Sequence, residues 1–457
     1  MKVKAFYCSV ILLLVTIGCE SPAQKLSPEE YEEDIEYLKL NLEKYHAGLY
    51  LHQSKEEFNT ISNRIASNYI NGSYVELVQN ITALTAAVKC GHTRMRMPPA
   101  ISDSIFSTFR YLPFNVKYLS DRLFIAKSLI DGINRGDEIL SINGKTISEI
   151  NNLIFPHVAS DGNNLTGKFR STEVLFRYRY PLYVEPTVTH YQVLLIDGNG
   201  DELKKEFPGF TMEEVTALFE SNSNEPELSL NNHGAYSILR ISTFGSSELN
   251  SAGYDYYDFL DEAFKKIQSQ NVENLILDLR DNGGGDDNYG AKLVSYLMNK
   301  DFNYFESITV TEDYSGYGRI ANRDGKRLMT SHKGLSTWKP DKNAFIGNLY
   351  ILINGNSFST CADVVSVLHH NGRGLLIGEE TGGGYNGNTS GSTDRITLPN
   401  SKIEVAIPMW CYKTANGYDT FQHHGAMPHK KVIPSRKQFI EGIDAELSVA
   451  QELINNN

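Results

Sequence analysis

Two apolar stretches that each run into a turn constrain the fold of this chain more than any other feature. Residues 275–285 read LILDLRDNGGG, and residues 352–384 begin LINGNSFSTC and end GEETGGG. Each stretch starts as a short, continuous apolar run and passes through its turn into a helical pattern. Buried strands that alternate with helices are typical of a parallel sheet that helices cover on both faces. We therefore expect an α/β fold with its functional turns at the carboxyl ends of the strands.

The sequence around both stretches repeats this alternation. We expect strands at residues 236–242, 275–279, 349–353 and 375–378, and helices at residues 254–268, 289–299 and 361–371. Together these elements predict a core domain over residues 208–457.

Upstream of this core the pattern of apolar residues changes twice along the sequence. Residues 28–69 and 74–88 carry apolar side chains at three- and four-residue steps, which predicts an N-terminal helical domain over residues 28–101. Short strands at residues 112–116, 123–126 and 137–142 follow, and an Asn143-Gly144 turn closes the last of them. The run GDEILSING resembles the GD-x-I-x-x-I-NG segment of PDZ domains, which bind peptide C-termini at a sheet edge. Residues 102–207 are therefore expected to form a PDZ-like, β-rich domain.

The first residues have the layout of a secretory signal. Lys2 and Lys4 precede an apolar run at residues 10–17, which is shorter than the roughly 20 residues that span a bilayer. Cys19 follows a small residue, as in bacterial lipoprotein signals, although Thr16 stands where leucine is usual. We expect a signal peptide at residues 1–18, lipidation of Cys19 and a polar tether at residues 19–27, with a plain signal peptide as the alternative. The protein is thus predicted to be exported and lipid-anchored in the cell envelope, in the periplasm or the outer membrane.

Composition excludes several classes of function. The 457 residues carry 43 Lys and Arg against 55 Asp and Glu, and the net charge of −12 disfavours binding to nucleic acid by general electrostatics. This length suits two or three domains. Outside the leader, Cys90, Cys361 and Cys411 show neither a disulfide framework nor metal-ligand spacing. We expect them to be small buried residues rather than nucleophiles or ligands.

The two turns carry the parts of an acyl-transfer site. The three glycines at residues 283–285 offer bare backbone amides, and Ser357 and Ser359 offer hydroxyl groups at the start of a helix. Amides and a hydroxyl in this arrangement can form an oxyanion hole and a nucleophile. A partial match to the nucleophile elbow, centred on Ser357, occurs in the run Gly355-Asn356-Ser357-Phe358-Ser359. Both serines are therefore candidates for the nucleophile. The alternative is that both hydroxyls only cap the helix.

Two long motifs in the right order show a family resemblance. Residues 278–285, DLRDNGGG, match a DLR-x-N-x-GG segment, and residues 358–383 run from FST to a GE-x-T-x-G turn. In these motifs, and in the PDZ-like region before them, the chain resembles the C-terminal processing (tail-specific) serine peptidases and their tricorn-like branch. The resemblance implies a crotonase-like (ClpP/crotonase) βα superhelical protease core, with an N-terminal helical cap and a PDZ-like domain.

The resemblance also implies roles for individual residues. By position, Ser359 is the nucleophile, and the backbone amides of Gly284 and Thr360 form the oxyanion hole. The tail-specific branch takes its general base from a lysine where this chain has Gly384, and no lysine lies between Lys342 and Lys402. The tricorn-like branch uses a histidine in a D-G-H-T segment instead. Cys90-Gly91-His92-Thr93 fits that segment except at Cys90, so His92 is the predicted base.

The acid that would orient this histidine is less well defined in the sequence. The tricorn-like branch carries a glutamate before a G-V-x-PD segment near the C-terminus. Gln422 stands nearest that glutamate position, His429 replaces the aspartate, and Asp419 is a second candidate for the orienting role. A glutamine could hold the imidazole by a hydrogen bond, but it would not stabilise the imidazolium cation.

These residues predict the function. The spacing of His423, His424 and His429 matches no zinc pattern, so no metal is predicted, and the expected chemistry needs no cofactor. We expect a serine-type endopeptidase that cleaves peptides or unfolded protein tails, engaged through their C-termini, by acyl-enzyme chemistry. The alternative is a catalytically inactive peptide-binding protein of the same fold. A hydrolase of small esters is a weaker third option, because the PDZ-like region favours polypeptide substrates.

Overall fold

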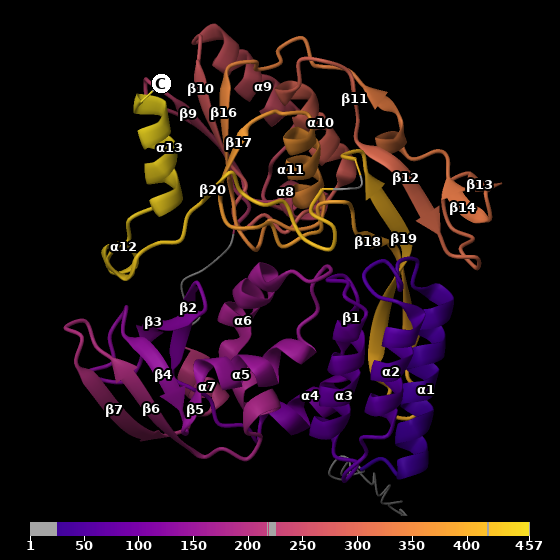
Figure 1. The fold of residues 1–457 in the computed structure, drawn as a ribbon, viewed down its shortest axis with the longest axis vertical. Helices are drawn as coiled ribbons and strands as arrows, with labels where there is room; N and C mark the ends of the chain where they lie inside the picture. The colour runs from indigo at the N-terminus through magenta and orange to yellow at the C-terminus, as the bar shows by residue number, and fades with distance from the viewer. Residues whose placement is uncertain (1–24, 217, 219–224, 418–419, 457) are drawn as a thin grey trace, which may run out of the picture.

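The computed structural model describes residues 25–216, 218, 225–417 and 420–456. The predicted signal peptide and Cys19 lie outside these residues. Figure 1 shows two halves, one built on a parallel sheet with its helices and the other on the N-terminal helices and an antiparallel sheet. No helix within the described ranges has both the length and the apolar character needed to cross a bilayer.

A six-stranded sheet forms the centre of the first half, in the order β20-β17-β16-β10-β9-β8. Its strands are β8 (Leu228–Asn232), β9 (Ser237–Ile241), β10 (Asn274–Asp278), β16 (Asn348–Ile353), β17 (Leu375–Gly378) and β20 (Lys430–Lys431). All neighbours pair in parallel except β8 and β9. The mainly parallel sheet predicted from the sequence is therefore confirmed, and β10 and β16, which precede the two motif turns, are neighbours in it.

Helices cover both faces of this sheet. They are α8 (Ser246–Ser251), α9 (Tyr256–Ser269), α10 (Asp287–Leu297), α11 (Thr360–His370) and α13 (Ala445–Asn455), and the short α12 (Arg436–Glu441), which has no buried residue, precedes α13. Leu275 and Leu277 of β10 face one core, which contains the buried side chains of α9, α10 and α11. Ile276, between them, packs in a second core with Ala450 of α13. Burial on both faces explains why β10 reads as a continuous apolar run, and the predicted helices are found within two residues of their expected ends.

An antiparallel sheet that the sequence analysis did not predict joins the two halves. Its order is β1-β19-β12-β14-β13, with β18 on the other edge of β19. The strands are β1 (Arg94–Arg96), β12 (Phe305–Val310), β13 (Ile320–Arg323), β14 (Lys326–Met329), β18 (Thr389–Thr397) and β19 (Glu404–Thr414). Figure 1 shows β18 and β19 extending from the first half alongside the N-terminal helices. Ile396, Val405 and Ile407 pack in the same core as those helices, so part of the predicted 208–457 core is buried by the N-terminal segment.

The N-terminal helices are α1 (Pro28–Tyr45), α2 (Lys55–Ala66), α3 (Tyr74–Ala87) and α4 (Pro99–Phe106). Ser27 caps α1 and Ser54 caps α2, each in a reciprocal capping box with a glutamate three residues on. The helices predicted at residues 28–69 and 74–88 are thus confirmed. They place residues 88–93, which contain the predicted base, between α3 and β1.

The second half also contains a sheet in the order β2-β3-β4-β6-β7, with β5 paired to β4. Its strands are β2 (Phe114–Leu119), β3 (Arg122–Ser128), β4 (Glu138–Ile142), β5 (Lys145–Thr146), β6 (His190–Ile196) and β7 (Glu202–Pro208). Asn143 and Gly144 have φ angles of 49° and 77°, as the predicted hairpin turn requires. Two helices that the sequence analysis did not predict, α5 (Ile147–Ile154) and α6 (Leu165–Arg179), accompany this sheet.

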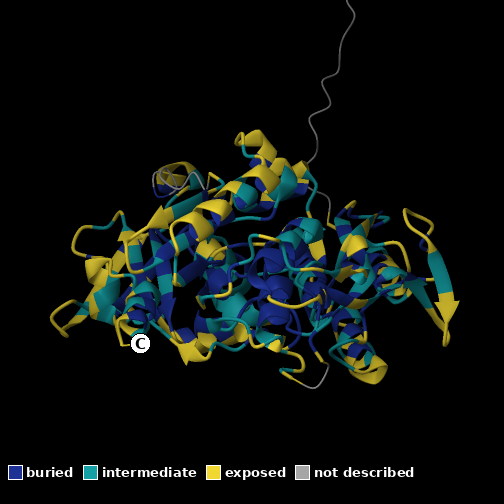
Figure 2. Cartoon of the chain, turned by 90° about the horizontal axis from the view of Figure 1, so that it is seen from above, coloured by how far each residue is buried: buried dark blue, intermediate teal, exposed yellow. Residues whose placement is uncertain are grey.

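Shorter elements complete the chain. They are η1 (Phe155–His157), η2 (Tyr180–Val184), η3 (Lys333–Leu335), α7 (Met212–Thr216) and the two-stranded sheet of β11 (Phe302–Asn303) and β15 (Thr337–Trp338). Figure 2 shows that the buried residues run through the middle of the molecule, with exposed segments at its periphery.

Candidate active site

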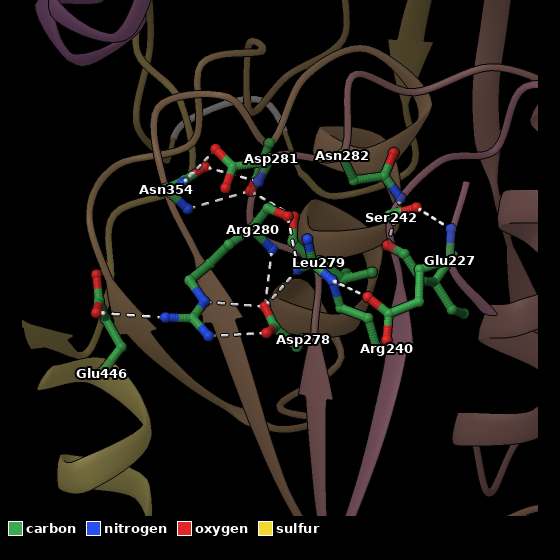
Figure 3. Close-up of polar contacts among 12 residues, drawn as sticks. Glu227, Arg240, Ser242, Asp278, Leu279, Arg280, Asp281, Asn282, Asn354 and Glu446 are labelled. Atoms are coloured by element: carbon green, nitrogen blue, oxygen red, sulfur yellow. Dashed lines mark hydrogen bonds and ion pairs between the residues drawn. The ribbon is translucent and has the colours of Figure 1, made fainter. Parts of the chain in front are cut away.

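Charged side chains hold the turn that follows β10 (Figure 3). Asp278 forms ion pairs with Arg240 at 2.9 Å and with Arg280 at 2.8 Å. Arg280 also pairs with Asp444, at the start of α13, at 2.8 Å, and with Glu446 at 3.4 Å. The DLR part of the first motif therefore anchors the turn to β9 and α13 rather than entering the reaction centre.

The two motif turns are joined directly to each other. The Asp281 amide donates to Asn354 Oδ1 at 3.1 Å, and Asn354 Nδ2 donates back to Asp281 Oδ1 at 2.9 Å. The Phe358 amide donates to the carbonyl oxygen of Asn282 at 3.0 Å. Because β10 and β16 are parallel neighbours, these bonds fix the glycine turn beside the serine turn at one edge of the sheet.

The structure separates the two candidate serines. Ser357 is fully buried, its hydroxyl donates to the Leu279 carbonyl at 2.9 Å, and it accepts from the Asn354 amide at 3.1 Å. Ser359 lies immediately before α11 and has φ 55° and ψ −131°, a conformation that non-glycine residues rarely adopt. Ser359 in this strained conformation lines the open cleft, whereas Ser357 stabilises the turn through its buried hydrogen bonds.

His92 lies against Ser359. Its Nε2 is 3.1 Å from Ser359 Oγ, and its ring stacks on Phe358 with centroids 4.6 Å apart. Burial, together with the positive charge of Arg94 and the nearby His46, lowers the pKa of His92 to about 3. The imidazole is therefore neutral at physiological pH and free to accept a proton. Its Nδ1 is buried and has no hydrogen-bond partner among the described residues.

Gly284 and Thr360 lie beside this pair. Gly284 has a φ of +95°, and a Cβ built on it would lie 2.7 Å from Ser359 Cβ and 3.0 Å from Thr360 N. The Thr360 amide donates to no acceptor in the described part of the chain, and the Thr360 hydroxyl donates to Asp287 Oδ1 at 2.9 Å. The Gly284 amide, in contrast, donates to Asn282 Oδ1 at 2.9 Å. The two amides predicted to bind the oxyanion are therefore adjacent, but the Gly284 amide already donates a hydrogen bond to Asn282.

Sequence reasoning missed one carboxylate in this region, Asp161, which precedes α6. It is only 2% exposed, and it accepts from the Gly91 amide at 2.8 Å and from the Gly384 amide at 3.2 Å. One of its oxygens, a ring nitrogen of His92 and Cys90 Sγ all lie within 4.8 Å of one another. Burial raises the pKa of Asp161 to about 6. No motif marks this residue, and its neighbours in the sequence are ordinary loop residues.

The predicted orienting residues are placed differently. Asp419 lies outside the described residues. Gln422 is exposed and lines a small cavity of about 20 Å³ with Gly384 and His52. His429 Nδ1 accepts from the Leu376 amide at 3.0 Å, in the parallel sheet. Gly384, the position at which the resemblance would place a lysine, instead uses its amide to hold Asp161.

Cys90, His92 and Asp161 are also the group that could hold a metal ion within the described part of the chain. Two of these residues already use their ligand atoms in hydrogen bonds, since Cys90 Sγ lies 3.2 Å from the Thr389 carbonyl and Asp161 accepts from two amides. Burial raises the pKa of the Cys90 thiol to about 12. The donor set therefore fits a hydrogen-bonded frame for His92 better than a metal centre.

An open cleft of about 450 Å³ leads to Ser359 and His92. The glycine turn at residues 283–285 forms one wall, and β1, β18 and β19 form the other, through Arg94, Arg395 and Ala406. This volume is sufficient for several residues of an extended peptide. The arrangement therefore places a hydroxyl group, a neutral imidazole and a backbone amide at the end of a cleft that could hold a peptide.

The chain is similar to a peptidase family in sequence and to solved structures in fold. Residues 235–432 match the family described as Peptidase family S41. The chloroplastic C-terminal processing peptidase of Tetradesmus obliquus is 24% identical over 181 residues, which are 40% of this chain but only 32% of that protein. The crystal structure of mature CPAF aligns with a TM-score of 0.67 and 16% identity over 94% of this chain and 98% of that one. Mature CPAF complexed with lactacystin gives 0.66 and 15%, over 94% and 99%.

Proposed function

We propose that this chain, which carries a peptidase family S41 domain over residues 235–432, is a serine-type endopeptidase that cleaves peptides or unfolded protein tails. The observation that carries the proposal is the 3.1 Å contact between His92 Nε2 and Ser359 Oγ at the end of an open cleft. A neutral imidazole within hydrogen-bond reach of a hydroxyl is the arrangement that general-base activation requires.

The proposed reaction uses these groups in order. Ser359 Oγ attacks the scissile carbonyl carbon while His92 Nε2 takes the hydroxyl proton. The tetrahedral oxyanion accepts a hydrogen bond from the Thr360 amide, and from the Gly284 amide once Asn282 releases it. His92 then gives its proton to the departing amine, and an acyl-enzyme remains on Ser359. Water, deprotonated by His92, attacks this ester and frees both Ser359 and the carboxylate product.

We assign the stabilisation of the His92 cation to Asp161, in place of Gln422 or Asp419. His92 gains a positive charge in a buried site where Arg94 already opposes it. Asp161 lies within 4.8 Å of a ring nitrogen of His92 and is ionised above its pKa of about 6. A carboxylate at that distance favours the imidazolium without bonding to it, and it acts as a positioning residue through the Gly91 amide.

The domain organisation and location of the protein are part of the same proposal. We assign residues 28–101 to a helical cap, residues 102–207 to a PDZ-like module and residues 208–457 to a crotonase-like core. The Asn143-Gly144 hairpin within an antiparallel sheet supports the module, and the parallel sheet with its helices supports the core. The signal-like leader and Cys19 support export and a lipid anchor in the cell envelope.

A fluorophosphonate probe tests the activity. We expect stoichiometric labelling of the wild type and no labelling of Ser359→Ala. The folded fraction of Ser357→Ala should be labelled like the wild type. Circular dichroism and thermal unfolding of both variants separate loss of the nucleophile from loss of the fold. An unlabelled but folded wild type would refute the proposal.

One pair of observations favours a second candidate, a catalytically silent peptide-binding protein. His92 Nδ1 has no partner among the described residues, and the Gly284 amide is engaged by Asn282. Peptide binding in the absence of fluorophosphonate labelling would support this candidate over the enzyme.

A further inference from the structure

One wall of the cleft carries two arginines in register. In the antiparallel sheet, Arg94 of β1 lies opposite Ala406 of β19, and Ala406 lies opposite Arg395 of β18. Directly opposed residues of neighbouring strands project from the same face of a sheet. Arg94 and Arg395 therefore flank the small Ala406 side chain, and all three residues line the cleft that leads to Ser359.

The other face of the same strands fixes these positions. Met95, Ile396 and Val405 alternate with the cleft-facing residues and pack in the core formed with the N-terminal helices. Because register and face are set by this burial, the arginines project from a rigid support rather than from a mobile loop. Arg94 is also tied back to the reaction centre, since its Nε donates to the Gly91 carbonyl at 3.2 Å.

Neither arginine has a carboxylate partner among the described residues, whereas Arg96, on the same face of β1, pairs with Glu404 at 4.0 Å. The carboxylate that lines the cleft, Asp287, accepts from the Thr360 hydroxyl, and burial raises its pKa to about 6. In a chain with a net charge of −12, two unpaired arginines beside one engaged acid make this cleft locally cationic.

We propose that Arg94 and Arg395 form a subsite that binds a carboxylate of the substrate close to the scissile bond. The guanidinium groups offer forked N–H donors that match a carboxylate, and the small Ala406 between them leaves room for it. The carboxylate can belong to an acidic side chain or to a free C-terminus. This inference rests on the proposed peptidase function, because it specifies the substrate of the same cleft.

The subsite also bears on turnover. The charge of Arg94 disfavours protonated His92 and favours ionised Asp161. A substrate carboxylate bound at Arg94 neutralises that charge and makes it easier for His92 to take the proton. A substrate with a carboxylate should therefore have a higher kcat, as well as a lower KM, than its neutral counterpart.

Peptide binding to the Ser359→Ala variant tests the subsite without requiring catalysis. The probes are versions of one fluorescein-labelled peptide of alanine, leucine and serine, with Glu or Gln at one internal position and a C-terminal acid or amide. Fluorescence anisotropy should show about tenfold tighter binding for a version with a carboxylate than for its neutral partner. The Glu/Gln pair and the acid/amide pair distinguish the two sources of the carboxylate.

Variants in this Ser359→Ala background assign the preference to the two arginines. Arg94→Gln and Arg395→Gln should each reduce the preference, and the double variant should abolish it. Arg96→Gln, which removes the same charge from the same strand outside the cleft, should retain it. Equal binding of all probes, uniformly undetectable binding, or an equal loss in Arg96→Gln would overturn the subsite. Charge-selective binding by a wild type that fluorophosphonate does not label would instead refute only the peptidase function.

Discussion

Replacing Asp161 by Asn tests the charge on which the proposed mechanism depends. The wild-type kcat/KM should fall as the pH drops below about 6, because Asp161 then becomes protonated and no longer stabilises the His92 cation. His92 cannot produce that decline, since its own pKa is lowered to about 3. Two unit charges within 4.8 Å of each other interact by about 3 kcal/mol at an effective dielectric constant of ~20. Asp161→Asn should therefore reduce kcat/KM at pH 8 by about two orders of magnitude and remove the acidic decline.

The same substitution has a stability signature with a definite sign. The pKa of Asp161 rises from 3.8 to about 6 on folding, so the folded state prefers the protonated acid. Its contribution is fully present below pH 3.8 and is lost as the pH rises through 6, a change of about 3 kcal/mol. Asparagine leaves one amide without its acceptor, a cost of about 1–3 kcal/mol that does not vary with pH. The stability advantage of the wild type over Asp161→Asn should thus shrink between pH 4 and pH 7 in urea unfolding.

Asp34 offers a matched control. It is fully buried and accepts the amides of Asn400 and Ser401 at 2.8 and 2.9 Å, the same kind of bonding as Asp161, but away from the cleft. Asp34→Asn should destabilise the fold and leave the pH dependence of kcat/KM unchanged. The proposed role of Asp161 is refuted if Asp161→Asn keeps the acidic decline with kcat/KM within about threefold of the wild type at pH 8. An equal loss of activity in the two variants would reduce Asp161 to a structural role.

Further predictions concern the turns and the thiols. Gly284→Ala places a Cβ 3.0 Å from Thr360 N and forces alanine to adopt a φ of +95°. Fluorophosphonate labelling of Ser359 should therefore slow by about 10²–10³-fold, while the circular dichroism spectrum stays native. Labelling at the wild-type rate would contradict this prediction. Arg280→Ala removes the ion-pair partner of Asp444 and Glu446 and one of the two partners of Asp278, and urea unfolding should show a loss of about 3–5 kcal/mol; a loss below about 1 kcal/mol would show that the network is dispensable. Cys90 and Cys361 are buried and their thiol pKa values are raised, so iodoacetamide at pH 8 should leave both unmodified by mass spectrometry and activity unchanged.

The sequence predicted the elements that bury continuous apolar runs. β10 and β16 are expected because no polar residue interrupts their apolar runs, and the turns after them are expected from the glycines that follow each run and weaken a strand interior. The β18–β19 hairpin was missed for the opposite reason. Residues 389–397 read TSGSTDRIT, and the side that packs on the N-terminal helices is apolar mainly at Ile396. Long-range packing, rather than local propensity, makes that segment a strand.

The residues of the candidate site also fall into those that the sequence indicates and one that it does not. Ser359 and Gly284 belong to motifs that can be read locally, and His92 followed from the order of segments along the chain once Gly384 left no lysine. Asp161 has no such signal, because its place is set by amides of Gly91 and Gly384, which are far from it in sequence. A contact made by backbone amides leaves no side-chain pattern to recognise.

The charges around His92 then explain why a carboxylate-bearing substrate suits this cleft. In the free protein, burial and Arg94 keep the imidazole neutral, which readies it as an acceptor but disfavours the cation that the reaction creates. Asp161 supplies one negative charge, and a substrate carboxylate at Arg94 and Arg395 removes the opposing positive one. Both changes act in the same direction on the proton transfer from Ser359. A neutral peptide would satisfy the nucleophile and the Thr360 amide but leave Arg94 uncompensated, so discrimination against it should be larger in the transition state than in binding.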